Sequence, residues 1–195
     1  RGIVAIANGQ GHIRGYVGAP MLGNMGLQEA VGCTGQIQVV KNHPSWPNPY
    51  NGIVPIQYGD IDRDVGRYLA ISEQRSCALA ASTAFHPPSG GLLCTASGGY
   101  LVGQLPDADP QTLAQVEQNL ATIVHQYCQD DACGDSTDTI PTNMLAMGFT
   151  PLGIAREILN GIPFTPLQQI QPTFKCSCSS QRLIRALRLL PRSEV

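Results

Sequence analysis

Hydrophobic and polar positions follow two different periods along this chain. In the first half, short apolar runs lie between clusters of glycine, proline and asparagine, as is typical of strands joined by tight turns. The runs Ile3–Ala7 and His12–Val17 predict a hairpin around a turn at residues 8–11. Residues 36–40 alternate cleanly between polar and apolar, which predicts a half-buried strand. Residues 52–59 predict an edge strand or an irregular one, because they contain Pro55. Further strands are predicted at 77–85 and 92–105, the second interrupted by a pair of glycines.

Apolar residues recur at helical spacing in the second half. Asp109 followed by Pro110 predicts the start of a helix that continues to Tyr127. Thr150 followed by Pro151 predicts a second helix start of the same kind. Another helix is predicted after the acids at 60–64, with Val65, Tyr68 and Leu69 on one side. A last helix is predicted after a cap at Ser179 or Ser180, and one of its faces carries Leu183, Ile184, Leu187 and Leu190.

This order of elements predicts an α+β fold, a mixed arrangement with a largely antiparallel twisted sheet, packed helices and a helical C-terminal extension. With 195 residues, of which 43% are hydrophobic, the chain is long enough to bury a core. The formal charge of −2 excludes a global basic field, so we expect neither nucleic acid nor a membrane as a partner. No apolar run approaches the roughly 18 residues that span a bilayer. Because the sequence begins at Arg1, a removed targeting segment or further chain upstream both stay open.

No motif for ATP-driven work or serine hydrolysis is present in the sequence. A strand followed by Gly9, Gly11 and Gly15 imitates a dinucleotide-binding turn. That mechanism needs a helix N-terminus directly after the glycines, whereas the following residues are extended and broken by Gly18 and Pro20. The hairpin turn is the preferred interpretation. Neither a GxxxxGKS/T phosphate loop nor a GxSxG elbow occurs, and the chain is not predicted to be an enzyme.

The cysteine count favours a reducing compartment. Seven cysteines are an odd number, and the chain is too long to need disulfides in place of a core. Cys33, Cys77 and Cys94 lie in or beside apolar segments, so we expect them to be small buried hydrophobes with inert thiols.

A group of residues that could bind a metal ion lies at the end of the long predicted helix. His125, Cys128 and Cys133 are candidates for a metal site, since imidazole and thiolate both bind zinc. The preferred alternative places His125 on the exposed side of its helix and the two cysteines in an acidic loop. A disulfide between Cys128 and Cys133 is a variation on that alternative.

The sequence FKCSCSSQRL places Cys176 and Cys178 one residue apart, just before the last predicted helix. A structural zinc takes four ligands in a tetrahedron, and a Cys-x-Cys supplies two of them. The other two ligands would come from another part of the chain, from further chain or from a partner. The same thiols can also be oxidised to a disulfide, which would be strained and reducible because the two residues are so close. The alternative without chemistry is two incidental cysteines before a helix.

FKCSCSSQRLIRALRLLP resembles the start of the zinc-binding region of the redox-regulated holdase chaperones, the heat shock protein 33 or 33 kDa chaperonin family. The segments ANGQGHIRGYVGAP, AVGCTGQIQVVKN, YNGIVPIQYGDIDRDVGRYLAISEQ and ASGGYLVGQLPDAD resemble the core segments of that family in the same order. The family pattern has a CxxC downstream of the CxC, which this sequence lacks, and its opening strands and first helix would lie ahead of Arg1. We therefore expect the chain to be a fragment.

The resemblance implies an ATP-independent chaperone that is inactive while reduced and zinc-bound. Oxidation would form disulfides and release zinc, and the unfolding that follows would uncover apolar surface for unfolded client proteins. Only Cys176 and Cys178 receive the zinc-ligand and redox roles. The resemblance divides the chain into a core domain at 1–126, a metastable linker at 127–175 and the start of a zinc-binding domain at 176–195. It also implies a homodimer in the active state and a cytoplasmic location, or an organelle if a targeting segment was removed.

The linker is expected to open before the core because its helix is short and has few apolar anchors. Two other functions stay open on the residues alone. A thiol-disulfide oxidoreductase would use Cys176 and Cys178 directly, although the Cys-x-x-Cys usual for that chemistry is absent. A zinc-dependent nucleic-acid module would use the arginines of the last predicted helix, Arg182, Arg185 and Arg188.

Overall fold

The computed structural model describes residues 2–18, 27–86, 93–127, 139–176 and 178–188. The chain forms two compact units. The first joins residues 1–23 to residues 167–195, and the second comprises residues 24–166. The first therefore brings together the two ends of the sequence, which include the candidate thiol pair.

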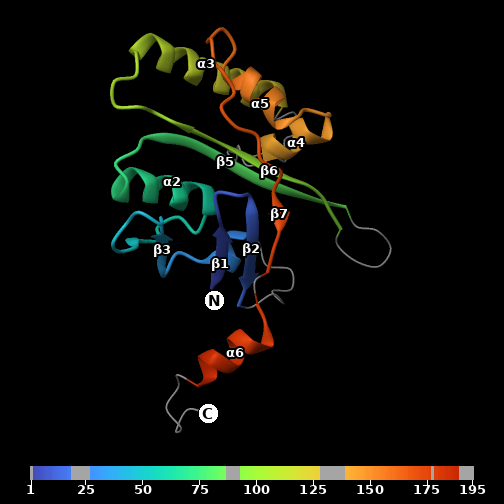
Figure 1. The fold of residues 1–195 in the computed structure, drawn as a ribbon. Coiled ribbons are helices and arrows are strands. Elements are labelled where there is room, and N and C mark those ends of the chain that lie inside the picture. Colours follow the sequence, from blue (N-terminus) through green and yellow to red (C-terminus); the bar gives the residue numbers. More distant parts are fainter. Residues whose placement is uncertain (1, 19–26, 87–92, 128–138, 177, 189–195) are drawn as a thin grey trace. The chain divides into compact units, whose positions relative to one another are not determined.

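The first unit is built on an antiparallel hairpin of β1 (Ile3–Ala7) and β2 (His12–Val17), as predicted. A third strand, β7 (Thr173–Phe174), pairs with β2 in parallel, and α6 (Ser180–Leu187) follows it (Figure 1). The hairpin turn is closed by the side chain of Asn8, whose Oδ1 accepts hydrogen bonds from two backbone amides at 3.0 Å each, those of residues 10 and 12.

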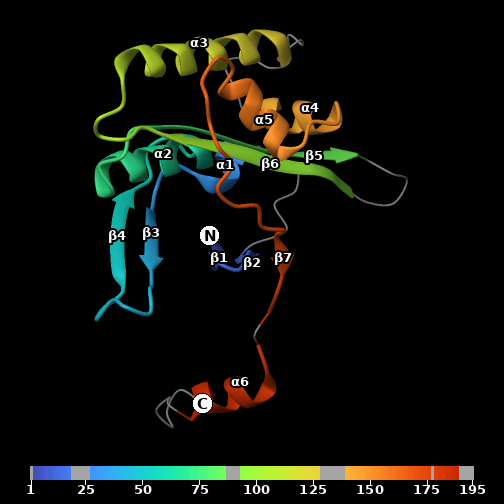
Figure 2. The ribbon, with the colours of Figure 1, turned by 45° about the horizontal axis from the view of Figure 1, so that its top comes forward.

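The described residues of the second unit form two antiparallel hairpins, four longer helices and the short helix α1. Its strand pairs are β3 (Gln36–Lys41) with β4 (Tyr50–Pro55), and β5 (Cys77–His86) with β6 (Leu93–Gly103). Its helices are α1 (Leu27–Val31), α2 (Ile61–Ser72), α3 (Pro110–Tyr127), α4 (Ile140–Ala146) and α5 (Pro151–Ile158). Figures 1 and 2 show α3, α4 and α5 over one face of the β5–β6 hairpin, with α2 on its opposite side.

The α+β class and the antiparallel pairing agree with the prediction, but the strands of the described residues form three small sheets instead of one. Strand β6 also runs without interruption through Gly98 and Gly99. These glycines lie where the backbone is closely approached. A Cβ on Gly98 would lie 2.6 Å from Cδ1 of Leu145, and one on Gly99 would lie 2.6 Å from the carbonyl oxygen of Ala80. The pair therefore allows close packing and does not break the strand.

Helix starts follow the local signals in the sequence. The side chains of Asp60, Asp109, Thr150 and Ser179 each accept a hydrogen bond from the amide nitrogen three residues later, as an N-cap does. The sequence allowed either Ser179 or Ser180 as the cap of the last helix, and the structure identifies Ser179. Proline occupies the first turn of α3, α4 and α5, where its missing N–H costs no helical hydrogen bond.

The buried core lies where α3, α4 and α5 meet. It comprises Ile123, Tyr127, Ile140, Met144, Ile154 and Ile158. Four of these six residues come from α4 and α5, within the segment that we expected to have few apolar anchors. The expectation of few apolar anchors is wrong, because helix α4 was not predicted and its Ile140 and Met144 are completely buried. The boundaries of a metastable linker stay a prediction.

Two acids of α2 are buried as well as the predicted Tyr68. The carboxylate of Asp64 accepts hydrogen bonds from the backbone amides of Gln57, Tyr58 and Asp60, at 2.8 to 3.2 Å. Burial by itself would raise the pKa of Asp64, but these backbone donors outweigh it and lower the pKa. Asp62 accepts from the backbone amide of Ala81 and so ties α2 to β5.

Candidate functional site

The candidate thiol pair lies directly after β7. The amide nitrogen of Thr173 donates to the carbonyl oxygen of Gly11 at 2.9 Å, and that of Lys175 donates to the carbonyl oxygen of Ile13 at 3.1 Å. The next residue is Cys176. Pairing with β2 therefore fixes the chain up to the first of the two thiols, both of which are exposed.

The two cysteines interact with each other. The backbone amide of Cys178 points to Sγ of Cys176 at 3.4 Å. Hydrogen bonds from the side chain and then the backbone of Cys178 lower the pKa of Cys176, with a smaller contribution from the positive charge of Arg14. The same interaction raises the pKa of Cys178, whose proton is held by the neighbouring sulfur. The interaction thus lowers the pKa of one thiol and raises that of the other, which is an arrangement suited to nucleophilic or redox chemistry.

The donor set of this pair fits half of a structural zinc site. Two thiolates from one turn of chain suit zinc chemically, but a closed tetrahedral site needs four ligands. Among the described residues, no group of three or more His, Cys, Asp or Glu side chains could hold a metal ion. Zinc binding by Cys176 and Cys178 stays a prediction, in which two further ligands come from elsewhere.

The other candidate metal group, His125 with Cys128 and Cys133, is only partly included in the described residues. Cys128 and Cys133 lie outside them. His125 is on the exposed side of α3, as the preferred alternative expected. The arginines of the last helix, Arg182 and Arg185, are also exposed on α6, together with Arg188 just after it.

The three cysteines expected to be buried are not uniformly so. Cys33 and Cys94 are exposed, and Cys77 is half-buried, with a pKa that burial raises. Apolar neighbours in the sequence indicate a regular element but not which of its residues are covered, and Cys33 lies just after α1 while Cys94 lies in β6. Cys94 also lies opposite Phe85 beside a register shift near the end of that hairpin, where the helices no longer cover the strands.

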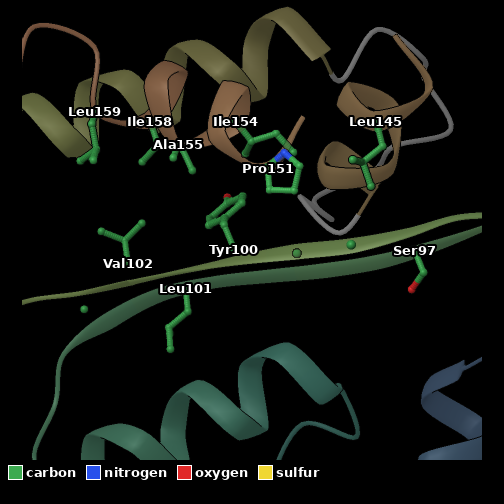
Figure 3. A pocket seen from close by; sticks show the side chains of 13 residues that line it. Ser97, Tyr100, Leu101, Val102, Leu145, Pro151, Ile154, Ala155, Ile158 and Leu159 are labelled. Carbon is green, nitrogen blue, oxygen red and sulfur yellow. The ribbon is translucent and has the colours of Figure 1, made fainter. Parts of the chain in front are cut away.

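An apolar cavity of about 380 Å³ lies between β6 and α5. In Figure 3, Tyr100 and Val102 point from β6 towards Ile154 and Ile158 on α5, while Leu101 points to the opposite side. The cavity was not predicted, because its walls come from segments about fifty residues apart and no local pattern brings them together. Its apolar lining fits contact with hydrophobic groups and provides no constellation for catalysis.

Many large apolar side chains are exposed elsewhere. On the first unit they include Ile3, Ile6, Ile13, Tyr16, Val17 and Phe174, and on the second Val40, Trp46, Ile53, Phe85, Leu93 and Leu101. Apolar side chains that are exposed singly are common on folded proteins, so these residues do not by themselves identify a binding surface. None of the helices in the described part of the chain is long and apolar enough to cross a membrane.

A sequence profile for the family described as Hsp33 protein matches residues 1–195. The chain is 30% identical over 192 residues to the 33 kDa chaperonin of Clostridioides difficile strain 630, an alignment that covers 95% of this chain and 59% of that protein. It is 28% identical over 200 residues to the 33 kDa chaperonin of Thermoanaerobacter sp. strain X514, covering 99% of this chain and 62% of that protein. The chain spans less than two thirds of the length of either relative.

The fold is similar to a solved structure as well. A crystal structure of the 33 kDa chaperonin, or heat shock protein 33 homologue, from Thermotoga maritima superimposes with a TM-score of 0.68 at 21% sequence identity. The superposition covers 98% of this chain and 65% of that one. At this level of identity the likeness concerns the fold.

Proposed function

The chain belongs to the Hsp33 family, and on this premise we propose that it acts as part of an ATP-independent holdase chaperone that is switched by oxidation and by release of zinc. The observation that carries the proposal is the match of the family profile to the whole of residues 1–195. The relatives' common name, 33 kDa chaperonin, supports a chaperone function. A holdase binds unfolding proteins without transforming them, so we assign no catalytic residues.

Clients of this chaperone are unfolded or partly unfolded proteins, which present apolar surface. The face of β6 that carries Tyr100 and Val102 packs against the core formed by α3, α4 and α5. Separation of α4 and α5 from the sheet would uncover this face and the buried side chains of Ile154 and Ile158. The arrangement supports a client-binding surface that is stored beneath these helices until the chaperone is activated.

The redox step takes place at Cys176 and Cys178. The Cys176 thiolate attacks one oxygen of hydrogen peroxide and releases hydroxide, which takes up a proton to become water. The thiol of Cys178 then attacks the resulting sulfenic acid, and the disulfide forms with loss of a second water. One peroxide thus accepts two electrons from the two thiols. Because a disulfide no longer offers thiolates, Cys176 and Cys178 could no longer hold a zinc ion after this step.

Zinc in the reduced state would hold these two sulfurs together with two further cysteine ligands. The active form is a homodimer that binds neither nucleic acid nor membrane, and its location is the cytoplasm. The formal charge of −2 supports the lack of a nucleic-acid partner.

The first test measures zinc and free thiols in the longest native form of the protein, before and after peroxide. We expect one zinc per chain, lost together with four thiols. The same samples are then mixed with a thermally unfolding enzyme, and light scattering reports its aggregation. Suppression only after oxidation supports the switch. Equal suppression in the reduced and oxidised samples contradicts it.

A matched pair of variants separates the thiol pair from other cysteines. The double substitution Cys176→Ser and Cys178→Ser is expected to abolish zinc binding, whereas Cys33→Ser, at another exposed cysteine, leaves it unchanged. The resemblance assigns two zinc ligands in this chain, Cys176 and Cys178, which cannot close a zinc site, so we expect the chain to suppress aggregation even under reductant. Inactivity of the chain under those conditions would argue against control by zinc.

A second candidate, a thiol-disulfide oxidoreductase, is favoured by one observation. The backbone amide of Cys178 lies 3.4 Å from Sγ of Cys176, and hydrogen bonds from Cys178 lower the pKa of the Cys176 thiol, a feature that such enzymes also use. Catalytic turnover of a dithiol substrate by the wild-type chain, lost in Cys176→Ser, would support it. Stoichiometric oxidation without turnover favours the holdase.

A further inference from the structure

The turn of the β1–β2 hairpin makes an unusually close contact with the segment that leads to the thiol pair. Gly11 has a φ of +78°, in the left-handed region that favours glycine. A Cβ at this position would overlap Cγ2 of Ile170 and would lie 3.2 Å from the carbonyl oxygen of Gln171. Gly11 is therefore required both by its own backbone conformation and by the chain that lies against it.

The same glycine begins the ladder that holds β7. Its carbonyl oxygen accepts the amide hydrogen of Thr173, and two residues further along β2 the carbonyl of Ile13 accepts that of Lys175. These two bonds are the backbone hydrogen bonds that join residues 167–176 to Gly11 and β2 in the described part of the chain. Strand β7 has only two residues, and Phe174 is 73% exposed, so little apolar burial supports the pairing.

We propose that Gly11 and the edge of β2 position the thiol pair, and that the β2–β7 ladder transmits a chemical change at Cys176 and Cys178 to the segment before them. A disulfide between residues two apart demands its own backbone geometry, and Cys176 follows directly after the last ladder bond. Because the β2–β7 ladder is short and weakly buried, we expect it to open before the longer β1–β2 pairing. The role of the ladder in regulation rests on the proposed redox function. The positioning of the thiol pair by Gly11 and β2 does not.

Amide hydrogen exchange tests the positioning role. In Gly11→Ala, we expect exchange at the amides of Thr173 and Lys175 to accelerate by about tenfold or more. Gly9→Ala is the matched control, because it changes the same turn but its Cβ would meet nothing within 4 Å. Trypsin gives a second readout, since cleavage after Lys175 requires the strand to leave β2. Equal exchange and cleavage in the two variants would overturn the proposal.

The hairpin itself must survive for this comparison. The amide of Gly18 donates to the carbonyl of Gly2 at 2.7 Å, at the opposite end of the hairpin, and its exchange reports whether β1 and β2 stay paired. If Gly11→Ala exposes that amide as well, Thr173→Pro decides the question. Proline removes the donor to Gly11 without altering the hairpin, and accelerated exchange at Lys175 is then expected. Unchanged exchange at Lys175 in Thr173→Pro overturns the proposal.

Transmission is tested on the wild-type chain. One equivalent of hydrogen peroxide converts the two thiols to a disulfide and yields two water molecules, and mass spectrometry verifies the product. We expect exchange at Thr173 and Lys175 to accelerate by about tenfold or more, with Gly18 unchanged. Unchanged exchange at the two amides after complete oxidation contradicts transmission. Aggregation assays on the same samples keep the two proposals apart. Accelerated exchange without protection of the client would support transmission through the ladder and contradict the holdase function. Protection of the client without accelerated exchange would support the holdase function and contradict transmission through the ladder.

Discussion

The side-chain amide of Asn119 donates hydrogen bonds to the carbonyl oxygen of Ile158 at 3.0 Å and to that of Asn160 at 2.8 Å. A buried residue of α3 thereby caps the C-terminal end of α5, where the last carbonyls have no helical partner. Gln115 in turn donates to Oδ1 of Asn119 at 3.0 Å. The helix that covers the proposed client surface is thus attached by a polar contact as well as by apolar packing.

Replacement of Asn119 by leucine is expected to destabilise the chain. The carbonyls of Ile158 and Asn160 would lose their donor while staying in a partly buried place, which costs about 1–3 kcal/mol. Urea denaturation measures the free energy of unfolding. Gln118→Ala, on the exposed side of the same helix, is the control and should change that free energy by no more than about 0.5 kcal/mol. Equal effects of both substitutions would show that the cap does not stabilise α5.

The cavity beneath α5 offers a stabilising substitution. Ala155 lines this cavity and points towards β6 (Figure 3). Leucine at this position would fill part of the space and raise the free energy of unfolding by about 0.5–2 kcal/mol. Ala114→Leu, the same change at an exposed position of α3, should have little effect. If the leucine fills the cavity, activation by oxidant should also become slower. A lower free energy of unfolding in Ala155→Leu would mean that the cavity is too narrow for the larger side chain.

Two glycines predict opposite effects of the same substitution. Gly66 lies inside α2 with nothing near the position of a Cβ, so Gly66→Ala should stabilise the chain by about 0.5–1 kcal/mol. At Gly99 the Cβ would lie 2.6 Å from a backbone oxygen, which cannot easily move. Gly99→Ala should therefore destabilise the chain by about 1–3 kcal/mol. Thermal unfolding of the two variants checks the difference in sign.

Asp64 makes stability depend on acid. Its pKa is lower in the folded chain than in the unfolded one, so its contribution is fully present above the unfolded pKa of about 3.9 and is lost as the pH falls through the folded value. Asp64→Asn should remove this part of the acid dependence and destabilise the chain at pH 7, because an amide cannot accept as many backbone hydrogen bonds. Unfolding at pH 7 and at pH 3 measures both effects. The exposed Asp107→Asn should leave the acid dependence unchanged.

The thiols should differ in reactivity. Because the pKa of Cys176 is lowered and that of Cys178 is raised, iodoacetamide should alkylate Cys176 first, and at lower pH. In Cys178→Ala the side-chain donor is lost, so the pKa of Cys176 should rise, while Cys178→Ser keeps a hydroxyl donor and should shift it less. Mass spectrometry of the alkylated peptides across a pH series measures this. Alkylation of both thiols at one rate would contradict the asymmetry.

Local signals in the sequence were sufficient for the elements that begin or end at a distinctive residue. Asp109 and Pro110 identify the start of α3, and the CxC identifies the candidate thiol site without any structure. The two-residue strand β7 has no such signal, because it exists only through pairing with β2. Helix α4 is similar: seven residues are too few to display a period, and its burial depends on α3 and α5.

The exposure of Cys33 and Cys94 was missed for a related reason. Apolar neighbours predict a regular element but do not determine which residues are covered, and Cys33 in fact lies between α1 and β3 while Cys94 lies in β6. Helices α3, α4 and α5 lie over one face of the β5–β6 hairpin and α2 lies on the opposite side, and the strand residues that stay exposed depend on where those helices lie. The cavity between β6 and α5 arises from the same tertiary arrangement.

The core residues between Ile123 and Ile158 are close neighbours along the chain as well as in space. Contacts between residues that are near in sequence re-form quickly, because little chain entropy is lost when they meet. If α4 and α5 separate from α3 during activation, they can therefore return without the rest of the chain refolding. The speed of that return would set how long a bound client has to leave before its binding surface closes again.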